Sequence, residues 1–473
     1  MTFRIVSRRR ALALMAGAAV AATSIAAGLS LSFAPAQPAE AAVAVAPKRL
    51  LVVSVTKGFR HDSIPVAEET LGQIGIRSRA FTVDYARTDE DIAAKMTPQA
   101  LKKYDAVFLA NTTGDLPIPD REAFLQWLRD GHGLLGAHAA ADTFHGYPAF
   151  IQALGGEFRG HGPQVKVNVR VEDKKHPATR HLGEGFEVFD EIYLFKNFDR
   201  ARVRGLLTMD THPNEGTPGD YPVAWCRMEG KGRVFYTSLG HRQEIWRSPW
   251  YQQHLLGGLR WAMGLEKSDA VPQKMASEVP ASERREGFRT VFNGNDLTGW
   301  HLRRKDGKAS WSVQNGMLVN AGGGTDLVTD ATFGDHVVRY EYLVPKGGNS
   351  GFYLRGRYEL QVQDDGDNKT PTRTSNGAVY GKVAPAVFAS KPAGQWQHAE
   401  ASVIGNRVTV VLNGNKIIDD APIEGVCGLA LDDKVGEPGP ILLQGDHSAV
   451  AYRNIRVKTL RPTVSPFNTA ATK

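Results

Sequence analysis

The pattern of apolar residues changes once along the chain, near residue 287, and this change limits the possible folds more than any other feature. Between about residues 49 and 265, continuous apolar runs such as RLLVVSV and YDAVFLAN alternate with amphipathic stretches such as REAFLQWLRDG. Uninterrupted apolar runs are typical of strands that are buried on both faces. Strands that alternate with helices predict an α/β domain with a doubly wound parallel sheet, which binds ligands at the carboxyl ends of its strands.

From residue 287 to about residue 460, short runs alternate apolar and polar residues and are broken by Gly and Asn turns. HVVRYEYLV, SGFYLRGRYELQVQD and AYRNIRVKTL are expected to be strands, and VLNGNKI contains an Asn-Gly turn typical of a hairpin. Such a density of short strands predicts an all-β sandwich. The polar segment 266–286, with two prolines, is expected to be an exposed linker. Residues 461–473 are expected to form a disordered tail.

The N-terminal residues 1–41 have the composition of an export signal. SRRRALALMAGAAVAATSIAAGLSLSFA places an arginine cluster before a long Ala-rich stretch, and AEA at 39–41 offers small residues for cleavage. Ser7-Arg8-Arg9 is similar to a twin-arginine signal, which predicts an exported periplasmic or extracellular protein. An uncleaved membrane anchor is the alternative. After removal of the signal we expect no membrane association.

The charge distribution and the cysteine content argue against a nucleic-acid partner and against a disulfide framework. The formal net charge is +7, but the chain has no block of basic residues and no nucleic-acid-binding motif, which argues against a nucleic-acid partner. The two cysteines, Cys226 and Cys427, fall in different predicted domains, so a disulfide framework is not expected.

Three histidines follow predicted strands of the first domain. His61 comes after RLLVVSVTKGFR, His138 ends GLLGAH, and His241 ends RVFYTSLGH. In a doubly wound sheet such positions converge on one crevice, and neutral imidazoles are good ligands for zinc or a similar divalent metal. A shared catalytic site and a structural role for each histidine are the alternatives. The candidate carboxylates that could complete a metal site are Asp142, Asp190 and Glu191.

An ordered series of motifs in residues 48–265 resembles the trehalose-utilisation (ThuA-like) family. The series includes VTKGFRHDSIP, GHGLLGAHAAADTF, LGGEFRGHGP and PVAWCRMEGKGRVFYTSLGH. This family is similar in fold to class I glutamine amidotransferases but lacks their cysteine nucleophile. In this chain His138 occupies the turn where such enzymes carry the nucleophile, so amide chemistry by a Cys–His pair is excluded.

Residues 287–460 resemble the 3-keto-disaccharide hydrolase family, which has a concanavalin-like jelly-roll fold. The motifs include FNGNDLTGW, NSGFYLRGRYELQVQDD, GAVYGKVAPAV and GPILLQGDHSAVAYRNI. After GDH the family usually has Gly-Pro, whereas Ser448-Ala449 follows here. The resemblance implies that Glu359 and His447 are catalytic. It implies substrate-binding roles for four further residues: Arg355, Gln361, Tyr380 and Lys382.

Both resemblances imply chemistry on 3-keto sugars such as 3-ketotrehalose. A ketone at C3 acidifies the C2 proton, so a general base can start a β-elimination that releases the aglycone, followed by hydration. The implied partners are a sugar substrate and a sugar 3-dehydrogenase that installs the ketone. Two alternatives are a non-catalytic carbohydrate-binding protein and a hydrolase of unoxidised β-glucans.

Overall fold

The computed structural model of the protein describes residues 47–273 and 277–460. The predicted signal peptide, residues 1–41, and the predicted tail, residues 461–473, lie outside these residues. Within the described ranges, none of the helices combines the length and the hydropathy that crossing a bilayer requires. The two predicted domains are described one at a time.

The first domain is built on a nine-stranded sheet with the order β2-β1-β3-β4-β11-β10-β9-β6-β7. The first five strands in this order are parallel, as predicted: β2 (Phe81–Ala86), β1 (Lys48–Val53), β3 (Ala106–Ala110), β4 (Gly133–Ala137) and β11 (Gly232–Thr237). The remaining strands are antiparallel: β10 (Pro218–Glu229), β9 (Arg204–Thr211), β6 (Val165–Val171) and β7 (Gly185–Asp190). The doubly wound parallel sheet is thus confirmed, with an antiparallel extension that the sequence pattern did not predict.

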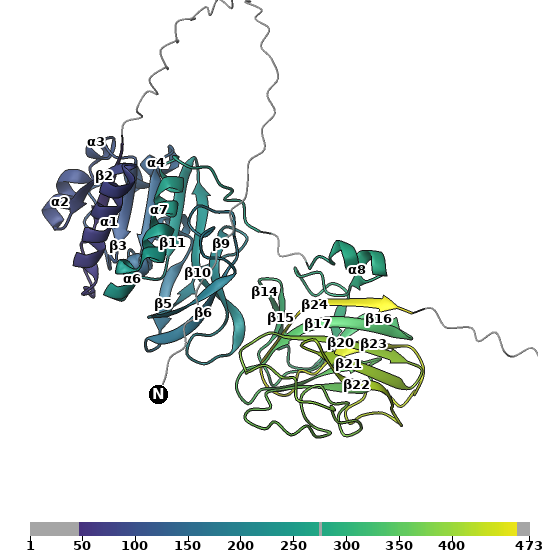
Figure 1. The fold of residues 1–473 in the computed structure, drawn as a ribbon. Helices are drawn as coiled ribbons and strands as arrows, with labels where there is room; N and C mark the ends of the chain where they lie inside the picture. Colours follow the sequence, from purple (N-terminus) through teal and green to yellow (C-terminus); the bar gives the residue numbers. More distant parts are fainter. Residues whose placement is uncertain (1–46, 274–276, 461–473) are drawn as a thin grey trace, which may run out of the picture. The chain divides into compact units, whose positions relative to one another are not determined.

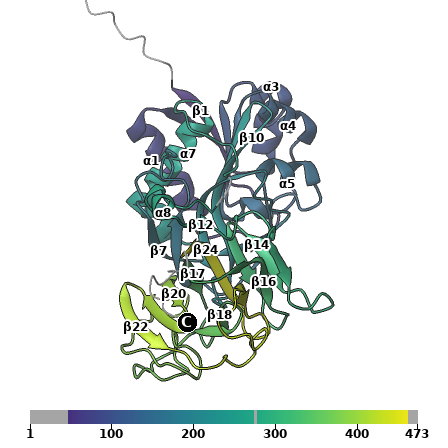
Figure 2. The same cartoon turned by 90° about the vertical axis from the view of Figure 1, so that its right-hand side faces the viewer.

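Helices cover both faces of this sheet. One face carries α1 (Ile64–Ser78), α6 (Gln243–Arg247) and α7 (Pro249–Ala262), and Figure 1 shows α1 and α7 across it. The other face carries α2 (Asp89–Lys95), α3 (Pro98–Leu101), α4 (Arg121–Arg129) and α5 (Pro148–Leu154). Figure 2 shows α1 and α7 on one side of the sheet and α4 and α5 on the other.

Strand β1 explains why the apolar runs are continuous. Leu50 and Val52 pack into the core layer that contains α1 and α7. Leu51 and Val53 pack into the opposite layer, which contains α4 and α5. Because successive side chains of a strand point to opposite faces, a strand covered on both sides needs apolar residues at every position.

Two smaller elements of the first domain lie near the carboxyl ends of the parallel strands. The Ala-rich segment after β4 is a short 3-10 helix, η1 (His138–Asp142), which contacts β4, β3 and β5. Strands β5 (Glu157–His161) and β8 (Tyr193–Lys196) form a separate two-stranded antiparallel sheet.

The second domain is an all-antiparallel sandwich of two sheets, which confirms the predicted fold class. The larger sheet contains β12 (Arg289–Thr290), β14 (Trp311–Gln314), β15 (Met317–Asn320), β24 (Val450–Thr459), β17 (His336–Leu343), β20 (Gln397–Ile404), β21 (Arg407–Leu412) and β22 (Asn415–Pro422). The smaller sheet has the order β13 (Trp300–Leu302), β16 (Leu327–Phe333), β23 (Gly439–Leu443), β18 (Asn349–Leu354) and β19 (Tyr358–Gln363). The core lies between the sheets, where the rings of Tyr340 from β17 and Phe352 from β18 stack with centroids 3.8 Å apart.

One predicted hairpin turn is confirmed, and a second hairpin turn lies where a single strand was expected. Asn413 and Gly414 connect β21 to β22 with φ values of 51° and 84°, the left-handed conformation that a type I′ turn requires. SGFYLRGRYELQVQD, expected to be one strand, is instead the hairpin of β18 and β19. Arg355 and Gly356 form its turn, with φ values of 54° and 68°. Within the expected linker, residues 281–286 form the short helix α8 (Ala281–Glu286).

Candidate functional site

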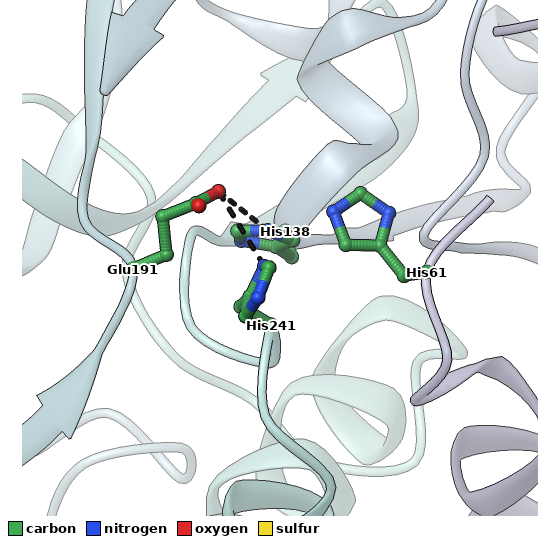
Figure 3. A group of neighbouring side chains, drawn as sticks. All are labelled: His61, His138, Glu191 and His241. Carbon is green, nitrogen blue, oxygen red and sulfur yellow. Dashed lines mark ion pairs between the residues drawn. The ribbon is translucent and has the colours of Figure 1, made fainter. Parts of the chain in front are cut away.

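The three histidines predicted to share a site lie together in the first domain, joined by one carboxylate. His61 follows β1, His138 follows β4, His241 follows β11 and Glu191 follows β7. Each offers one ligand atom, and these atoms all lie within 4.8 Å of one another. Figure 3 shows His61 and Glu191 on opposite sides of the group, with His138 and His241 between them. We call these four residues the histidine–glutamate cluster.

The spacing of the histidine–glutamate cluster fits a divalent metal ion. Zinc–nitrogen bonds of about 2.0 Å in tetrahedral geometry place neighbouring ligand atoms about 3.3 Å apart. Glu191 Oε1 lies 3.5 Å from His138 Nε2 and 3.4 Å from His241 Nδ1. These contacts are long for hydrogen bonds, and His61 Nδ1, His138 Nε2 and His241 Nδ1 are buried without a hydrogen-bond partner. Buried nitrogens that face a carboxylate without hydrogen bonds are the donor set that a metal would satisfy.

The pKa shifts of His61 and Glu191 suit metal binding, whereas that of His241 favours a proton that a metal would have to displace. Burial, together with the nearby His138 and His241, lowers the pKa of His61 to about 3, so its imidazole is neutral and keeps a free lone pair. Burial alone would raise the pKa of Glu191, but its contacts with His138 and His241 outweigh that effect and hold the pKa well below its ordinary value. The contact with Glu191 raises the pKa of His241.

The backbone fixes the orientation of His138. Its φ of 44° is unusual for a residue other than glycine and places the ring at a sharp turn between β4 and η1. His138 Nδ1 lies 2.8 Å from the Ser238 carbonyl oxygen, to which it donates. Because Nδ1 carries the proton, Nε2 is left with its lone pair toward the cluster. The ring of Tyr193 packs against this imidazole with centroids 4.1 Å apart.

Asp190 supports the loop that carries His241 and is not a member of the cluster. Its carboxylate accepts hydrogen bonds from the backbone N–H groups of Gly240 at 2.8 Å and Arg242 at 3.2 Å, on either side of His241. The Gly240 carbonyl accepts from Asn111 Nδ2 at 3.0 Å and from Trp246 Nε1 at 2.8 Å. These hydrogen bonds therefore fix both the N–H and the carbonyl group of Gly240, the residue before His241.

The structure distinguishes among the three carboxylates predicted as ligands. Only Glu191 belongs to the cluster. Asp142 instead contacts His145 Nε2 at 2.5 Å, and Asp190 supports the His241 loop. His161, which sits in the glycine-flanked FRGHGP motif and has no role in the sequence prediction, contacts the second Glu191 oxygen, with Nδ1 3.1 Å from Oε2. Its distance in sequence from Glu191 gave no indication of this pairing.

The second domain carries Glu359 on the polar face of its smaller sheet. Phe352, Leu354 and Leu360 of the β18–β19 hairpin face the core. Tyr353, which pairs with Glu359 in the register, packs outside that core. Glu359 therefore lies on the face that points away from the core, and it is 5 % exposed.

The surroundings of Glu359 favour its neutral form. Burial raises its pKa to about 7, against an ordinary value of 4.5, and the carboxylates of Asp446 and Asp326 act in the same direction. Tyr353 and His447 oppose this shift. His447 therefore lies close enough to Glu359 for their charges to interact, and its Nδ1 lies 2.6 Å from the Asp446 carboxylate.

Two predicted substrate-binding residues, Tyr380 and Gln361, lie beside Glu359, and Lys382 lies in the same loop as Tyr380. The backbone N–H of Tyr380 donates to the Glu359 carbonyl at 2.9 Å, and the Tyr380 side chain is partly exposed. Lys382 follows in the same loop, and its backbone N–H donates to the Val379 carbonyl oxygen at 2.8 Å. Gln361 Nε2 donates to Asn349 Oδ1 at 3.1 Å, whereas Gln361 Oε1 is buried without a partner.

Arg355 has a structural role, which corrects its predicted role in substrate binding. It is 1 % exposed, and its guanidinium donates to the carbonyl oxygens of Gly334 and Gly405, each at 3.0 Å. It also donates to the Asp335 carboxylate at 2.6 Å. Because the expected single strand is a hairpin, the turn carries Arg355 away from the row that contains Glu359, and its buried guanidinium is not accessible to a sugar.

Comparisons with known proteins agree with both resemblances. Residues 49–262 match the family model described as trehalose utilisation, and residues 287–458 match the model described as a 3-keto-alpha-glucoside-1,2-lyase-like domain. A curated relative from Bacteroides thetaiotaomicron named 3-keto-disaccharide hydrolase is 24 % identical over 33 % of this chain. The chain spans 66 % of the length of that relative.

Solved structures are similar to each half separately. A protein described as ThuA-like from Bacteroides uniformis covers 51 % of this chain and is itself fully covered, at 25 % identity and a TM-score of 0.39. The carbohydrate-binding module CBM66 from Bacillus subtilis covers 35 % of this chain, with 98 % of its own length matched, at 17 % identity and a TM-score of 0.24. The two family matches show that the chain joins a domain of the trehalose utilisation family, residues 49–262, to a 3-keto-alpha-glucoside-1,2-lyase-like domain, residues 287–458.

Proposed function

We propose that this protein cleaves 3-keto-glycosides such as 3-ketotrehalose and releases a 3-keto-glucose, with proton abstraction carried out by the second domain. The match to the 3-keto-alpha-glucoside-1,2-lyase-like domain and the name of the curated relative support this substrate class. The observation that carries the proposal is the buried Glu359 carboxyl, with its pKa near 7, on the polar face beside His447.

Because the substrate carries a ketone at C3, a weak base is sufficient to remove the proton from C2. A carbonyl at C3 acidifies the hydrogen on C2, so a carboxylate can remove it without a nucleophile at the anomeric carbon. An efficient general base has a pKa near the working pH. Glu359 meets this condition, whereas an ordinary carboxylate with a pKa near 4.5 is a much weaker base.

The residues near Glu359 can complete the reaction with all atoms balanced. Glu359 takes the C2 proton, the electron pair forms a C1–C2 double bond, and the C1–oxygen bond to the aglycone breaks. His447 donates the proton that the leaving oxygen needs. Water then adds across the double bond: its hydroxyl bonds to C1, its remaining proton goes to His447, which gave up a proton in the first step, and Glu359 returns its proton to C2. The net reaction is hydrolysis, with both side chains restored.

Polar side chains around Glu359 are suited to hold the sugar. Gln361 offers a buried carbonyl oxygen without a partner, which can accept a hydrogen bond from a sugar hydroxyl. We assign Tyr380 and Lys382 to the rim of the same site, because their loop is hydrogen-bonded to the backbone of Glu359. A glycosidase that acts on unoxidised sugars would instead hold two carboxyl groups about the anomeric carbon.

The first domain is assigned a metal-dependent second site for the same class of sugar. His61, His138, His241 and Glu191 would hold the ion, and His161 and the Ser238 carbonyl would orient Glu191 and His138. A bound divalent ion supplies Lewis-acid polarisation of a carbonyl oxygen.

The test is turnover of a keto sugar against its unoxidised counterpart. The purified protein is incubated with 3-ketotrehalose or trehalose, and the release of glucose and 3-ketoglucose is followed by mass spectrometry. We expect products from 3-ketotrehalose alone, with Glu359→Gln abolishing their release. The matched control is Glu341→Gln, a carboxylate on the larger sheet that binds Arg453, and this variant should keep its activity. Full activity in Glu359→Gln together with loss in His138→Ala would contradict the assignment to the second domain, and cleavage of trehalose would contradict the substrate class.

Export and a dehydrogenase partner complete the proposal. The twin-arginine-type sequence at Arg8-Arg9 is expected to direct the protein out of the cytoplasm, and replacing both arginines by lysine should leave it in the cytoplasmic fraction. A 3-keto sugar must come from an oxidation at C3, so a sugar 3-dehydrogenase is the class of enzyme that supplies the substrate.

A further inference from the structure

A large aromatic side chain stands exposed beside the histidine–glutamate cluster. Phe59 is 68 % exposed, and its ring meets the ring of His61 edge to face, with centroids 4.8 Å apart and planes at 81°. Single exposed apolar residues are common and need no explanation by themselves. Direct contact between such a ring and a candidate metal ligand is a more specific arrangement.

The backbone around Phe59 is held in place by Thr113. The Phe59 carbonyl accepts from Thr113 Oγ1 at 3.0 Å, and the Gly58 N–H donates to the same hydroxyl oxygen at 3.1 Å. The Lys57 N–H donates to the Thr113 carbonyl at 2.8 Å. Thr113 is itself buried. Thr113 therefore fixes the backbone at Phe59, whose ring remains exposed although burial of an apolar side chain is favourable.

A polar group occupies the opposite end of the cluster. Figure 3 shows Glu191 on the side away from His61. His161 contacts Glu191 from outside, and its side chain is substantially exposed. The cluster thus lies between an exposed aromatic ring on the His61 side and an exposed imidazole on the Glu191 side.

This arrangement matches the two kinds of surface on a pyranose ring. One face of a pyranose presents C–H groups that pack on an aromatic ring, while the hydroxyl or carbonyl groups at its edge need polar partners. We infer that Phe59 is the platform on which the sugar ring of a substrate packs while the oxygen atoms at its edge approach the histidine–glutamate cluster. This inference rests on the proposed action of the protein on sugars, and it gives the first domain its own sugar-binding subsite.

The test reads the distance between sugar and metal directly. The full chain with Glu359→Gln is loaded with Mn²⁺, and paramagnetic relaxation of the protons of trehalose and of 3-ketotrehalose is measured. Only sugar near the ion relaxes faster, and the Glu359→Gln substitution prevents turnover of the keto sugar by the second domain during the measurement. We expect Phe59→Ala to weaken this binding by about fivefold, because aromatic packing of this kind contributes on the order of 1 kcal/mol. Phe59→Tyr, which keeps the ring, should restore it.

Two controls separate the outcomes. Mn²⁺ affinity should stay within about twofold in Phe59→Ala and be lost in His61→Ala, which shows that Phe59 acts on the sugar and not on the metal. Ile76→Ala removes another exposed apolar side chain, on α1, and should change nothing. Equal relaxation in the Glu359→Gln chain with and without Phe59→Ala, or no relaxation at all, overturns the inference. A different outcome is that Phe59→Ala abolishes the relaxation while the unsubstituted protein does not cleave 3-ketotrehalose. That result would support the inference and refute the proposed function.

Discussion

Replacing Glu359 by glutamine should stabilise the second domain at alkaline pH while it removes the proposed base. The pKa of Glu359 is raised to about 7 in the folded protein, chiefly by burial, from 4.5. Holding such a group ionised in the folded state costs about 3 kcal/mol. Glutamine is always neutral and nearly the same size, so it avoids this cost.

The sign of the effect depends on pH. Below about pH 4.5 the carboxyl is protonated in both the folded and the unfolded chain, and no electrostatic cost exists. Between about pH 4.5 and 7 the folded chain binds more protons than the unfolded chain, so the stability of the unsubstituted protein falls as pH rises. Above about pH 7 the full cost is present. Glu359→Gln should therefore match the unsubstituted protein at pH 4 and exceed it by about 3 kcal/mol at pH 8.

Differential scanning calorimetry at the two pH values measures this difference. For a domain of this size the gain corresponds to roughly 6–12 °C in the transition of the second domain at pH 8. The matched control is Glu341→Gln, because burial would raise the pKa of Glu341 but Arg453 holds it below its ordinary value. That variant should be less stable than the unsubstituted protein at pH 8, and the difference should shrink as pH falls, because the unsubstituted protein loses this stabilisation when Glu341 is protonated. A Glu359→Gln protein that is equally stable or less stable at pH 8 would refute the argument that burial destabilises the Glu359 carboxylate.

Three further predictions concern pH, the cluster and the hairpin turn. The value of kcat/KM for 3-ketotrehalose should rise with pH through about 7 as Glu359 ionises, and a profile already flat at pH 5 would exclude it as the base. Asp190→Asn should weaken Zn²⁺ binding by about 10–100-fold in a metal titration, because it loosens the backbone on both sides of His241, and unchanged affinity would contradict that role. Arg355→Ala should lower the free energy of unfolding by about 1.5–3 kcal/mol in denaturant titrations, because it removes the three hydrogen bonds that the buried guanidinium donates to the Asp335 carboxylate and to the Gly334 and Gly405 carbonyl oxygens. It should leave the KM for the sugar unchanged, and a large rise in KM with normal stability would restore the substrate-binding assignment.

The proximity of the three histidines could be predicted from the sequence, because all parallel strands of a sheet end at the same edge. Continuous apolar runs identified β1, β4 and β11, and the carboxyl ends of such strands lie at one edge, so His61, His138 and His241 were expected to meet. Glu191 could be named only as one of three candidates. It follows β7, in the antiparallel extension of the sheet, and the sequence pattern gave no order for those strands.

The Arg355 assignment failed for a local reason. Alternation of side chains predicts faces correctly only while the strand continues, and Arg355-Gly356 turns the chain back. A glycine inside an alternating run is the signal that could have shown this. Glu359 and Gln361 kept their common face because the hairpin register pairs Tyr353 with Glu359 and Gly351 with Gln361.

The order in which the ligands occur along the chain has a consequence for biosynthesis. The four residues of the histidine–glutamate cluster are supplied by segments that run from residue 61 to residue 241, and neighbouring ligands are separated by long stretches of chain. A nascent chain on the ribosome therefore holds no two of these ligands closely spaced enough to trap an ion early, and the site is assembled only when β11 has joined the sheet. Capture of a metal ion would then report that the last strand of the first domain's sheet is in place, with only α6 and α7 still to follow, and the bound ion would lock in that step.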